Sequence, residues 1–197
     1  TKDNPADRAQ SRVWVVDPID GTKAFVRGER GFSGSIALLE GDRPVVAALF
    51  NPLTDEMFVA AEGQGATLNG ECIMAPPTCA LGGCGMILRP EMHARLGAHP
   101  GRPKTRLLTP MPNSIAHRVA LVAAGRWDAA IGLGKTNDWD VAAAVLILRE
   151  AGGMATDGYG QPFAFNRPVT SHPGVVAAGA GLHPLIMEKL QGLSRPA

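Results

Sequence analysis

Apolar residues in the first third of the chain are gathered in short runs. The runs cover residues 13–16, 33–40, 45–50 and 56–61, and the segments between them are rich in Gly, Pro, Asn and Asp. Short apolar runs bounded by turn-forming residues are typical of strands. A short helical turn is expected at residues 22–26. The pattern therefore predicts a meandering antiparallel sheet in the first third of the chain.

Helical and strand-like patterns alternate in the later part of the chain. Ser114 can cap a helix that runs to Ala124, because Ile115, Val119 and Val122 recur at helical spacing. In chain order, the other expected elements are strand 85–88, helix 90–96, strand 127–133, helix 141–151, strands 154–156 and 175–178, and helix 184–191, with loops over 72–83 and 97–104. This order indicates an α+β fold built from stacked sheet and helix layers.

Composition narrows the class of protein. Hydrophobic residues make up 45% of the 197 residues and charged residues 19%, which is typical of a folded globular protein. The formal net charge is +1 and aromatic residues make up 5%, so the sequence offers neither a basic field nor a stacking platform for a nucleic-acid polymer. No apolar run reaches membrane-spanning length, so no membrane partner is expected. Cys72, Cys79 and Cys84 form no CxxC pair, which predicts reduced thiols in a cytoplasmic protein.

Residues 17–22, with the sequence DPIDGT, carry the clearest chemical signal. A strand delivers two carboxylates into a turn that Pro18 stiffens and that Gly21 allows to bend sharply. Carboxylates on such a turn can hold hard divalent cations beside a phosphate. An ordinary Asp- and Gly-rich turn and a calcium loop are the alternatives, and Ile19 at the third position argues against a calcium loop.

A second acidic site stands at Asp140, near the start of the predicted helix 141–151. Taken alone, Asp140 is better explained as a helix cap, since Asp is favoured at the N-cap and suits the positive end of the helix dipole. Beside Asp17 and Asp20, it can instead complete a metal cluster as a bridging ligand. Asp138 is then the better candidate for the cap.

These segments together resemble the signatures of the inositol monophosphatase family. Residues 14–22 (WVVDPIDGT) are similar to the first signature, and residues 139–143 (WDVAA), followed by 150–153 (EAGG), are similar to the second. The similarity covers essentially the whole chain. It implies an α+β fold, a layered α/β/α sandwich of the sugar-phosphatase type with a mainly antiparallel first sheet. It also implies Mg²⁺-dependent hydrolysis of a small phosphomonoester.

The resemblance implies roles for individual residues. The implied Mg²⁺ ligands are the side chains of Asp17, Asp20 and Asp140 and the backbone carbonyl of Ile19. The N–H groups of Gly21 and Thr22 would face the substrate phosphate. The hydroxyl of Thr22 would orient the attacking water, so Thr22 and Asp20 are the residues expected to be catalytic.

The chain departs from the family at its N-terminus. Family members carry a further N-terminal segment with two helices, the first strands and a Glu-Glu motif that supplies a metal ligand, and an upstream carboxylate pairs with the threonine that here is Thr22. We therefore expect residues 1–197 to be a single, N-terminally truncated domain that lacks the N-terminal helical layer. The first sheet and the metal-binding turn are expected in residues 1–110, and a second α/β half in 111–197. By itself this chain should bind metal weakly and hydrolyse slowly or not at all.

Substrate choice is the second departure. Where many inositol phosphatases hold a sugar hydroxyl with a Glu, this chain has Leu133. Residues 135–140 (KTNDWD) and 23–26 (KAFV) are more similar to bacterial relatives that remove the 3′-phosphate from adenosine 3′,5′-bisphosphate, which is the preferred substrate. Inositol monophosphate, another sugar phosphate and histidinol phosphate are the alternatives. A hypothesis of another class is a catalytically silent remnant that serves as a dimerisation or ligand-binding module. The resemblance also implies a homodimer.

Other polar residues receive structural interpretations. The histidines show no metal-ligand spacing, and all are expected to be structural or exposed; they are His93, His99, His117, His172 and His183. His117 is the one that could approach the substrate. Arg118, on the same predicted helix, is expected to be a solvated surface charge rather than a phosphate ligand.

Overall fold

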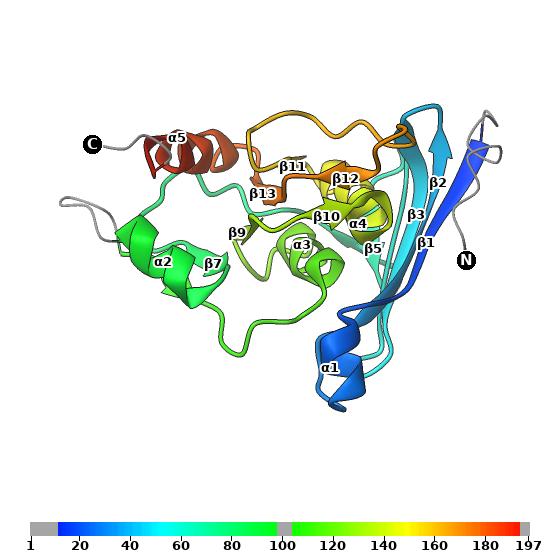
Figure 1. Cartoon of the computed structure of the whole chain (residues 1–197), viewed down its shortest axis with the longest axis horizontal. Coiled ribbons are helices and arrows are strands. Elements are labelled where there is room, and N and C mark those ends of the chain that lie inside the picture. Colours follow the sequence, from blue (N-terminus) through cyan, green and yellow to red (C-terminus); the bar gives the residue numbers. More distant parts are fainter. Residues whose placement is uncertain (1–11, 98–103, 194–197) are drawn as a thin grey trace.

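The computed structural model of this chain describes residues 12–97 and 104–193. Its first sheet contains, in spatial and chain order, β1 (Arg12–Asp20), β2 (Ser33–Glu40), β3 (Arg43–Asn51), β4 (Glu56–Ala61), β5 (Ala66–Leu68) and β6 (Glu71–Ile73). Each strand pairs antiparallel with the next, and α1 (Thr22–Val26) follows β1 (Figure 1). The predicted meander is confirmed, and the hairpin β5–β6 extends it.

The second sheet has the order β11-β13-β9-β7-β8. Its strands are β7 (Gly85–Ile87), β8 (Arg106–Leu107), β9 (Ala129–Gly132), β11 (Gly153–Thr156) and β13 (Val175–Gly179). Strand β7 runs parallel to β8 and β9, while the β9–β13 and β13–β11 pairs are antiparallel. A separate two-stranded ladder joins β10 (Thr136–Asn137) to β12 (Ser171–His172).

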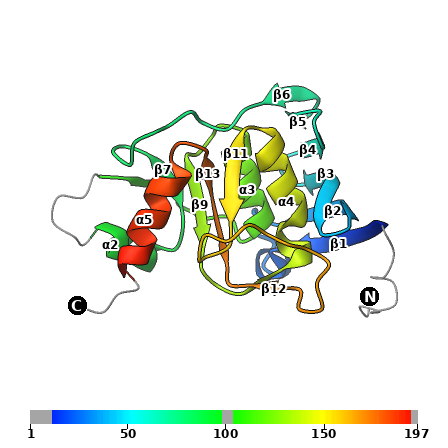
Figure 2. The same ribbon diagram turned by 90° about the horizontal axis from the view of Figure 1, so that it is seen from above.

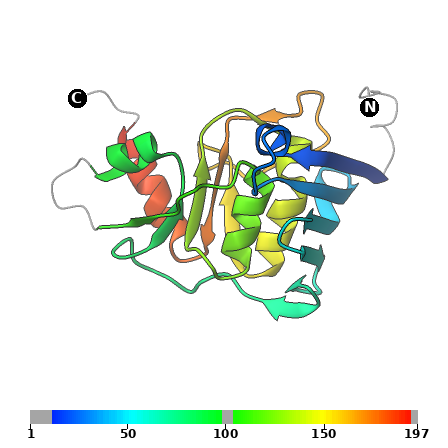
Figure 3. The ribbon, with the colours of Figure 1, turned by 90° about the horizontal axis from the view of Figure 1, so that it is seen from below.

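Helices separate the two sheets and cover the far side of the second one. Helices α3 (Ile115–Ala123) and α4 (Asp138–Glu150) lie between the first sheet and the second sheet (Figures 2 and 3). Helices α2 (Pro90–Gly97) and α5 (His183–Leu193) lie on the other side of the second sheet. This is the layered α+β sandwich that the sequence predicts.

The core follows these layers. Side chains of α3 and α4 pack with Leu39, Leu49 and Phe58 of the first sheet in one continuous buried cluster. A second cluster fills the space between the second sheet and α5, which contributes Ile186. The strands of the first sheet alternate buried and exposed positions, so that one face of the sheet supplies this core.

The opposite face of the first sheet is also apolar. We call it the outer apolar face, and its exposed large side chains are Trp14, Val16, Ile36, Val46, Met57 and Val59. Cross-strand pairing places them in adjacent rows, since Val16 pairs with Ile36, and Ala48 of β3 pairs with both Ile36 and Val59. Both described long helices between the sheets pack on the inner face instead.

The structure corrects two expectations about the elements and adds three short strands. The division at residue 110 is wrong, because β7 and β8 pair into the second sheet ahead of that position. Strand β9 is shorter than the predicted 127–133. The two-residue strands β8, β10 and β12 carry too little pattern to be predicted. The predicted loop 97–104 lies largely outside the described residues.

Among the described helices, none is at once long enough and apolar enough to cross a lipid bilayer.

Candidate metal and phosphate site

Three carboxylates from distant parts of the chain meet at one point. Asp17 and Asp20 stand at the end of β1, and Asp140 lies in the first turn of α4. Each offers a carboxylate oxygen, and these oxygens lie within 4.8 Å of one another. Among the residues described, this is the one cluster of His, Cys, Asp or Glu with the spacing of a metal site.

A register shift in the first sheet brings the two carboxylates of β1 together. Residues three apart on a regular strand point to opposite faces of the sheet. Here β1 pairs with β2 at Asp17↔Ser35 and next at Asp20↔Ser33, so three steps on β1 match two on β2. A bulge of this kind redirects side chains. Within the turn, Oδ1 of Asp17 accepts a hydrogen bond from the backbone N–H of Ile19 at 3.0 Å.

Asp20 is buried against the start of α3. Its Oδ2 accepts hydrogen bonds from the hydroxyl of Ser114 at 2.6 Å and from the backbone N–H of Ala116 at 2.9 Å. Burial raises the pKa of Asp20 to about 6, although these two hydrogen bonds act in the opposite direction. Burial is also the main cause that raises the pKa of Asp17, and the negative charge of Asp140 adds to it.

Asp140 takes part in the cap of α4 as well as in the acidic cluster. Its Oδ2 accepts a hydrogen bond from the backbone N–H of Asn137 at 2.7 Å, which closes a capping box at the start of α4. The N-cap residue is therefore Asn137, and the prediction that Asp138 caps the helix is wrong. Asp138 is instead buried, where its carboxylate accepts hydrogen bonds from Asn166 at 2.9 Å and from His172 at 2.8 Å.

The turn after β1 holds the remaining predicted site residues. Gly21 has a φ of 87°, in the left-handed region that favours glycine. A Cβ atom at this position would lie 2.8 Å from the backbone nitrogen of Ser114, so the turn needs glycine for space as well. The hydroxyl of Thr22 donates to the carbonyl oxygen of Ile19 at 3.0 Å, which closes the turn over the backbone atom predicted to bind metal.

Arg118 differs from its sequence interpretation, and Ser114 has a contact beyond the predicted one. Arg118 is only 8% exposed rather than solvated, and its guanidinium donates to the carbonyl oxygens of Pro112 at 2.6 Å and Asn113 at 2.9 Å. Burial lowers the pKa of Arg118 to about 10. Ser114 caps the helix as the sequence predicts, and it also donates to Asp20, a contact that the sequence does not predict. No local pattern in the sequence signals a contact across 94 positions.

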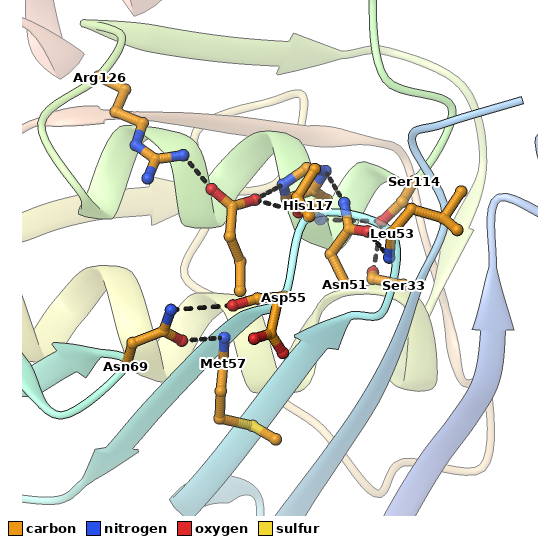
Figure 4. A network of polar contacts seen from close by, with 11 residues as sticks. Ser33, Asn51, Leu53, Asp55, Met57, Asn69, Ser114, His117 and Arg126 are labelled. Carbon is orange, nitrogen blue, oxygen red and sulfur yellow. Dashed lines mark hydrogen bonds and ion pairs between the residues drawn. The ribbon is translucent and has the colours of Figure 1, made fainter.

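The described histidines agree with the structural interpretation. His117 is buried and makes polar contacts with Glu56 and Asn51 (Figure 4). His172 bonds to Asp138, and His93 lies 2.8 Å from the hydroxyl of Thr105. His183, also buried, contacts Thr156. His99 lies outside the described residues.

The cluster has the donor chemistry of a site for a hard divalent cation. All three side chains offer carboxylate oxygens, which Mg²⁺ and similar ions prefer. Like charges and burial together make the ionised cluster unfavourable without a cation, as the raised pKa values of Asp17 and Asp20 indicate. A bound cation removes this penalty.

Comparisons with known proteins point in one direction. A sequence model described as the inositol monophosphatase family matches residues 2–195. The Nus factor SuhB of Xylella fastidiosa is 37% identical over 151 residues, which cover 74% of this chain and 54% of that protein. A fructose-1,6-bisphosphatase/inositol-1-monophosphatase of Thermotoga maritima is 35% identical over 158 residues, which cover 74% of this chain and 57% of that protein.

Comparison of the fold with solved structures finds similarity to the same family. A solved IMPase of Thermotoga maritima superimposes with a TM-score of 0.77 at 29% sequence identity, covering 93% of this chain and 70% of that chain. By the sequence matches, the chain spans little more than half the length of the two curated relatives, at 54% and 57%.

Proposed function

Because the chain belongs to the inositol monophosphatase family, we propose that it is the metal-binding part of a phosphatase that hydrolyses small phosphomonoesters with Mg²⁺. One observation carries the proposal. Asp17, Asp20 and Asp140 come from two distant segments, and their carboxylate oxygens meet within 4.8 Å. An ordinary turn and an ordinary helix cap would have no reason to meet in this way.

The cation and the turn would divide the chemistry between them. In the proposed site, Asp17, Asp20, Asp140 and the carbonyl of Ile19 hold Mg²⁺. A bound divalent cation supplies Lewis acidity that makes water a better nucleophile and neutralises charge on the phosphoryl oxygens. The tight turn at Gly21 supports a role of its backbone, with that of Thr22, in holding the phosphate. Thr22 donates its hydroxyl hydrogen to Ile19, so its oxygen keeps lone pairs that can accept a hydrogen from the attacking water.

Adenosine 3′,5′-bisphosphate is the substrate that we propose first. The basis is the sequence around the two acidic segments, and the apolar Leu133 supports it. Leu133 is 41% exposed in the loop between β9 and β10, where it offers a sugar hydroxyl no hydrogen bond from its side chain. Inositol monophosphate fits the relatives equally well, since several of them are named for it. Sugar phosphates and histidinol phosphate are weaker candidates.

Two further proposals concern assembly and activity. We propose that the active protein is a homodimer, as the resemblance implies. The alternative to an active phosphatase is a silent remnant that binds ligands or dimerises without catalysis. The chain's limited coverage of its relatives favours low activity of these 197 residues alone.

Metal binding tests the proposal first. We expect the chain to bind Mn²⁺, used as a paramagnetic substitute for Mg²⁺, and Asp17→Asn and Asp140→Asn to weaken binding at least about 10-fold. Asp42→Asn is the matched control, because Asp42 is an exposed carboxylate paired with Arg167 away from the cluster. Electron paramagnetic resonance of free Mn²⁺ measures the Mn²⁺ affinity of the parent chain and of the three variants. Equal affinity in Asp42→Asn and Asp140→Asn would contradict the site.

Phosphate release tests the activity. We expect a chimera that places the N-terminal segment implied by the resemblance, taken from the Thermotoga maritima relative, before β1 to release phosphate faster than this chain alone, by several powers of ten. Adenosine 3′,5′-bisphosphate and inositol 1-phosphate are compared in the same assay. A chimera that binds Mn²⁺ and releases no phosphate from either substrate would favour the silent remnant.

A further inference from the structure

We propose that Ser114 is a positioning residue for Asp20, and that its hydroxyl, locked in one orientation at the start of α3, aims the Asp20 carboxylate at the cation. This role rests on the proposed function, because it concerns a ligand of the proposed metal site. It adds to that site a residue on a different element, far from both acidic segments in the sequence.

The hydrogen bonds of Ser114 leave its hydroxyl a single orientation. A serine hydroxyl has one hydrogen to donate and two lone pairs that accept. Ser114 donates its hydrogen to Oδ2 of Asp20 at 2.6 Å and accepts from the backbone N–H of His117 at 2.9 Å. The hydroxyl of Ser33 lies 2.8 Å away (Figure 4). Because Ser114 has already donated its hydrogen, Ser33 is the donor in that contact.

Burial makes this arrangement rigid. Ser33 and Ser114 are both fully buried, so water cannot replace either hydroxyl. Every hydrogen-bonding position of the Ser114 hydroxyl is filled, and rotating it would leave a buried group unsatisfied. The donor that faces Asp20 is therefore fixed before any ligand arrives.

The backbone of α3 supports the same orientation of Asp20. The N–H of Ala116 also donates to Oδ2, at 2.9 Å, so both donors hold the same carboxylate oxygen. With Oδ2 occupied by these two donors, the proposal assigns Oδ1 to the cation. The start of α3 is in turn fixed to the loop between α1 and β2, because the backbone N–H of Ser114 donates to the carbonyl of Gly31 at 2.8 Å.

A helix cap explains only part of these contacts. As N-cap of α3, Ser114 needs to accept from His117, and it does. Capping does not require its hydroxyl to donate to a carboxylate. The test must therefore separate loss of the donor from loss of the cap.

Three variants make this separation. Ser114→Gly removes the donor and keeps a residue that is tolerated at the N-cap. Ser114→Thr keeps both the donor and the cap. Val119→Ala is the stability control, since Val119 is fully buried on the same helix and takes no part in the polar contacts of Ser114. Mn²⁺ affinity of the full 197-residue chain is measured by electron paramagnetic resonance, and melting temperature is measured in parallel without metal.

We expect Ser114→Gly to weaken Mn²⁺ binding about 10- to 100-fold. Ser114→Thr should bind like the parent, and Val119→Ala should melt earlier with unchanged Mn²⁺ affinity. The positioning role alone is overturned if the parent binds Mn²⁺ and Ser114→Gly binds equally well, or if Val119→Ala loses as much affinity as Ser114→Gly. A parent chain that shows no Mn²⁺ binding at millimolar concentration would overturn both this role and the proposed metal site.

Discussion

At the scale of single residues, the stability of the fold and the proposed metal site favour different protonation states of Asp20. Burial raises its pKa from 3.8 in the unfolded chain to about 6 in the folded one. Between these two values the folded chain binds more protons than the unfolded chain, so the free energy of unfolding falls as the pH rises through this window. The contribution of Asp20 is fully present at lower pH and is lost above about pH 6, where the carboxylate is ionised. The proposed metal site uses that ionised form.

Asp20→Asn should therefore stabilise the metal-free chain at neutral pH. We expect a gain of up to about 3 kcal/mol and a smaller loss of stability between pH 4 and 6, because Asn keeps an acceptor for Ser114 and Ala116 without a charge. Urea unfolding in EDTA at several pH values measures the gain, with Asp42→Asn as control. An unchanged pH dependence in Asp20→Asn would show that this carboxyl does not govern it.

The sequence predicts the residues of the acidic cluster better than the neighbouring residues of α3 that surround it. Residues 17–22 form a rare string, so Asp17 and Asp20 could be identified without any structure. Arg118 was misjudged for a physical reason: every residue of α3 is buried, and a helix buried on all sides has no polar face that marks its exposed positions. The partnership of Ser114 with Asp20 arises only when α3 packs against β1.

At the scale of elements, α3 is joined to the β3–β4 turn by a buried polar network. Nε2 of His117 lies 3.2 Å from Oε2 of Glu56, and its Nδ1 lies 3.4 Å from Nδ2 of Asn51 (Figure 4). Asn51 donates through its amide, so Nδ1 accepts and Nε2 carries the hydrogen. Arg126 pairs with the other oxygen of Glu56. Burial lowers the pKa of His117 and so favours the neutral ring, while the charge of Glu56 acts in the opposite direction.

His117→Ala should loosen this junction. The substitution leaves Glu56 and Asn51 with buried polar atoms that lose a partner, and it opens a cavity beneath Phe58. We expect the free energy of unfolding to fall by about 2–4 kcal/mol. Glu188→Gln, an exposed change on α5, is the control in the same urea unfolding experiment. A loss no larger than that of Glu188→Gln would mean that the network does not hold α3 in place.

Elements that a local sequence pattern defines are predictable, and elements that depend on tertiary contacts are not. Strands β2 and β4 and the turn α1 have the predicted bounds, because apolar runs and turn residues define them locally. The β10–β12 ladder has two residues on each side and depends on contacts across the chain. The cap of α4 was assigned one residue too late, since Asn137 and Asp138 are both favoured cap residues.

At the scale of the whole molecule, the first sheet presents apolar side chains on both faces. Helices α3 and α4 cover the inner face, and the outer apolar face is exposed, with Trp14 at 58%. Strands with apolar residues on both faces are typical of sheets covered on both sides. Apolar patches of this kind favour association.

The isolated chain should therefore self-associate through the outer apolar face. We expect Trp14→Lys to weaken association markedly, because it places a charge among Val16, Leu38 and Ile36 on neighbouring positions of β1 and β2. Tyr159→Lys is the matched control, since Tyr159 is an aromatic side chain, 73% exposed, in a loop of another region. Sedimentation velocity over a range of concentrations measures the association of the parent and both variants. Because Trp14 is exposed, its replacement should leave the urea unfolding of the monomer nearly unchanged. If Trp14→Lys and Tyr159→Lys associate as strongly as the parent, the contact between copies lies on another surface.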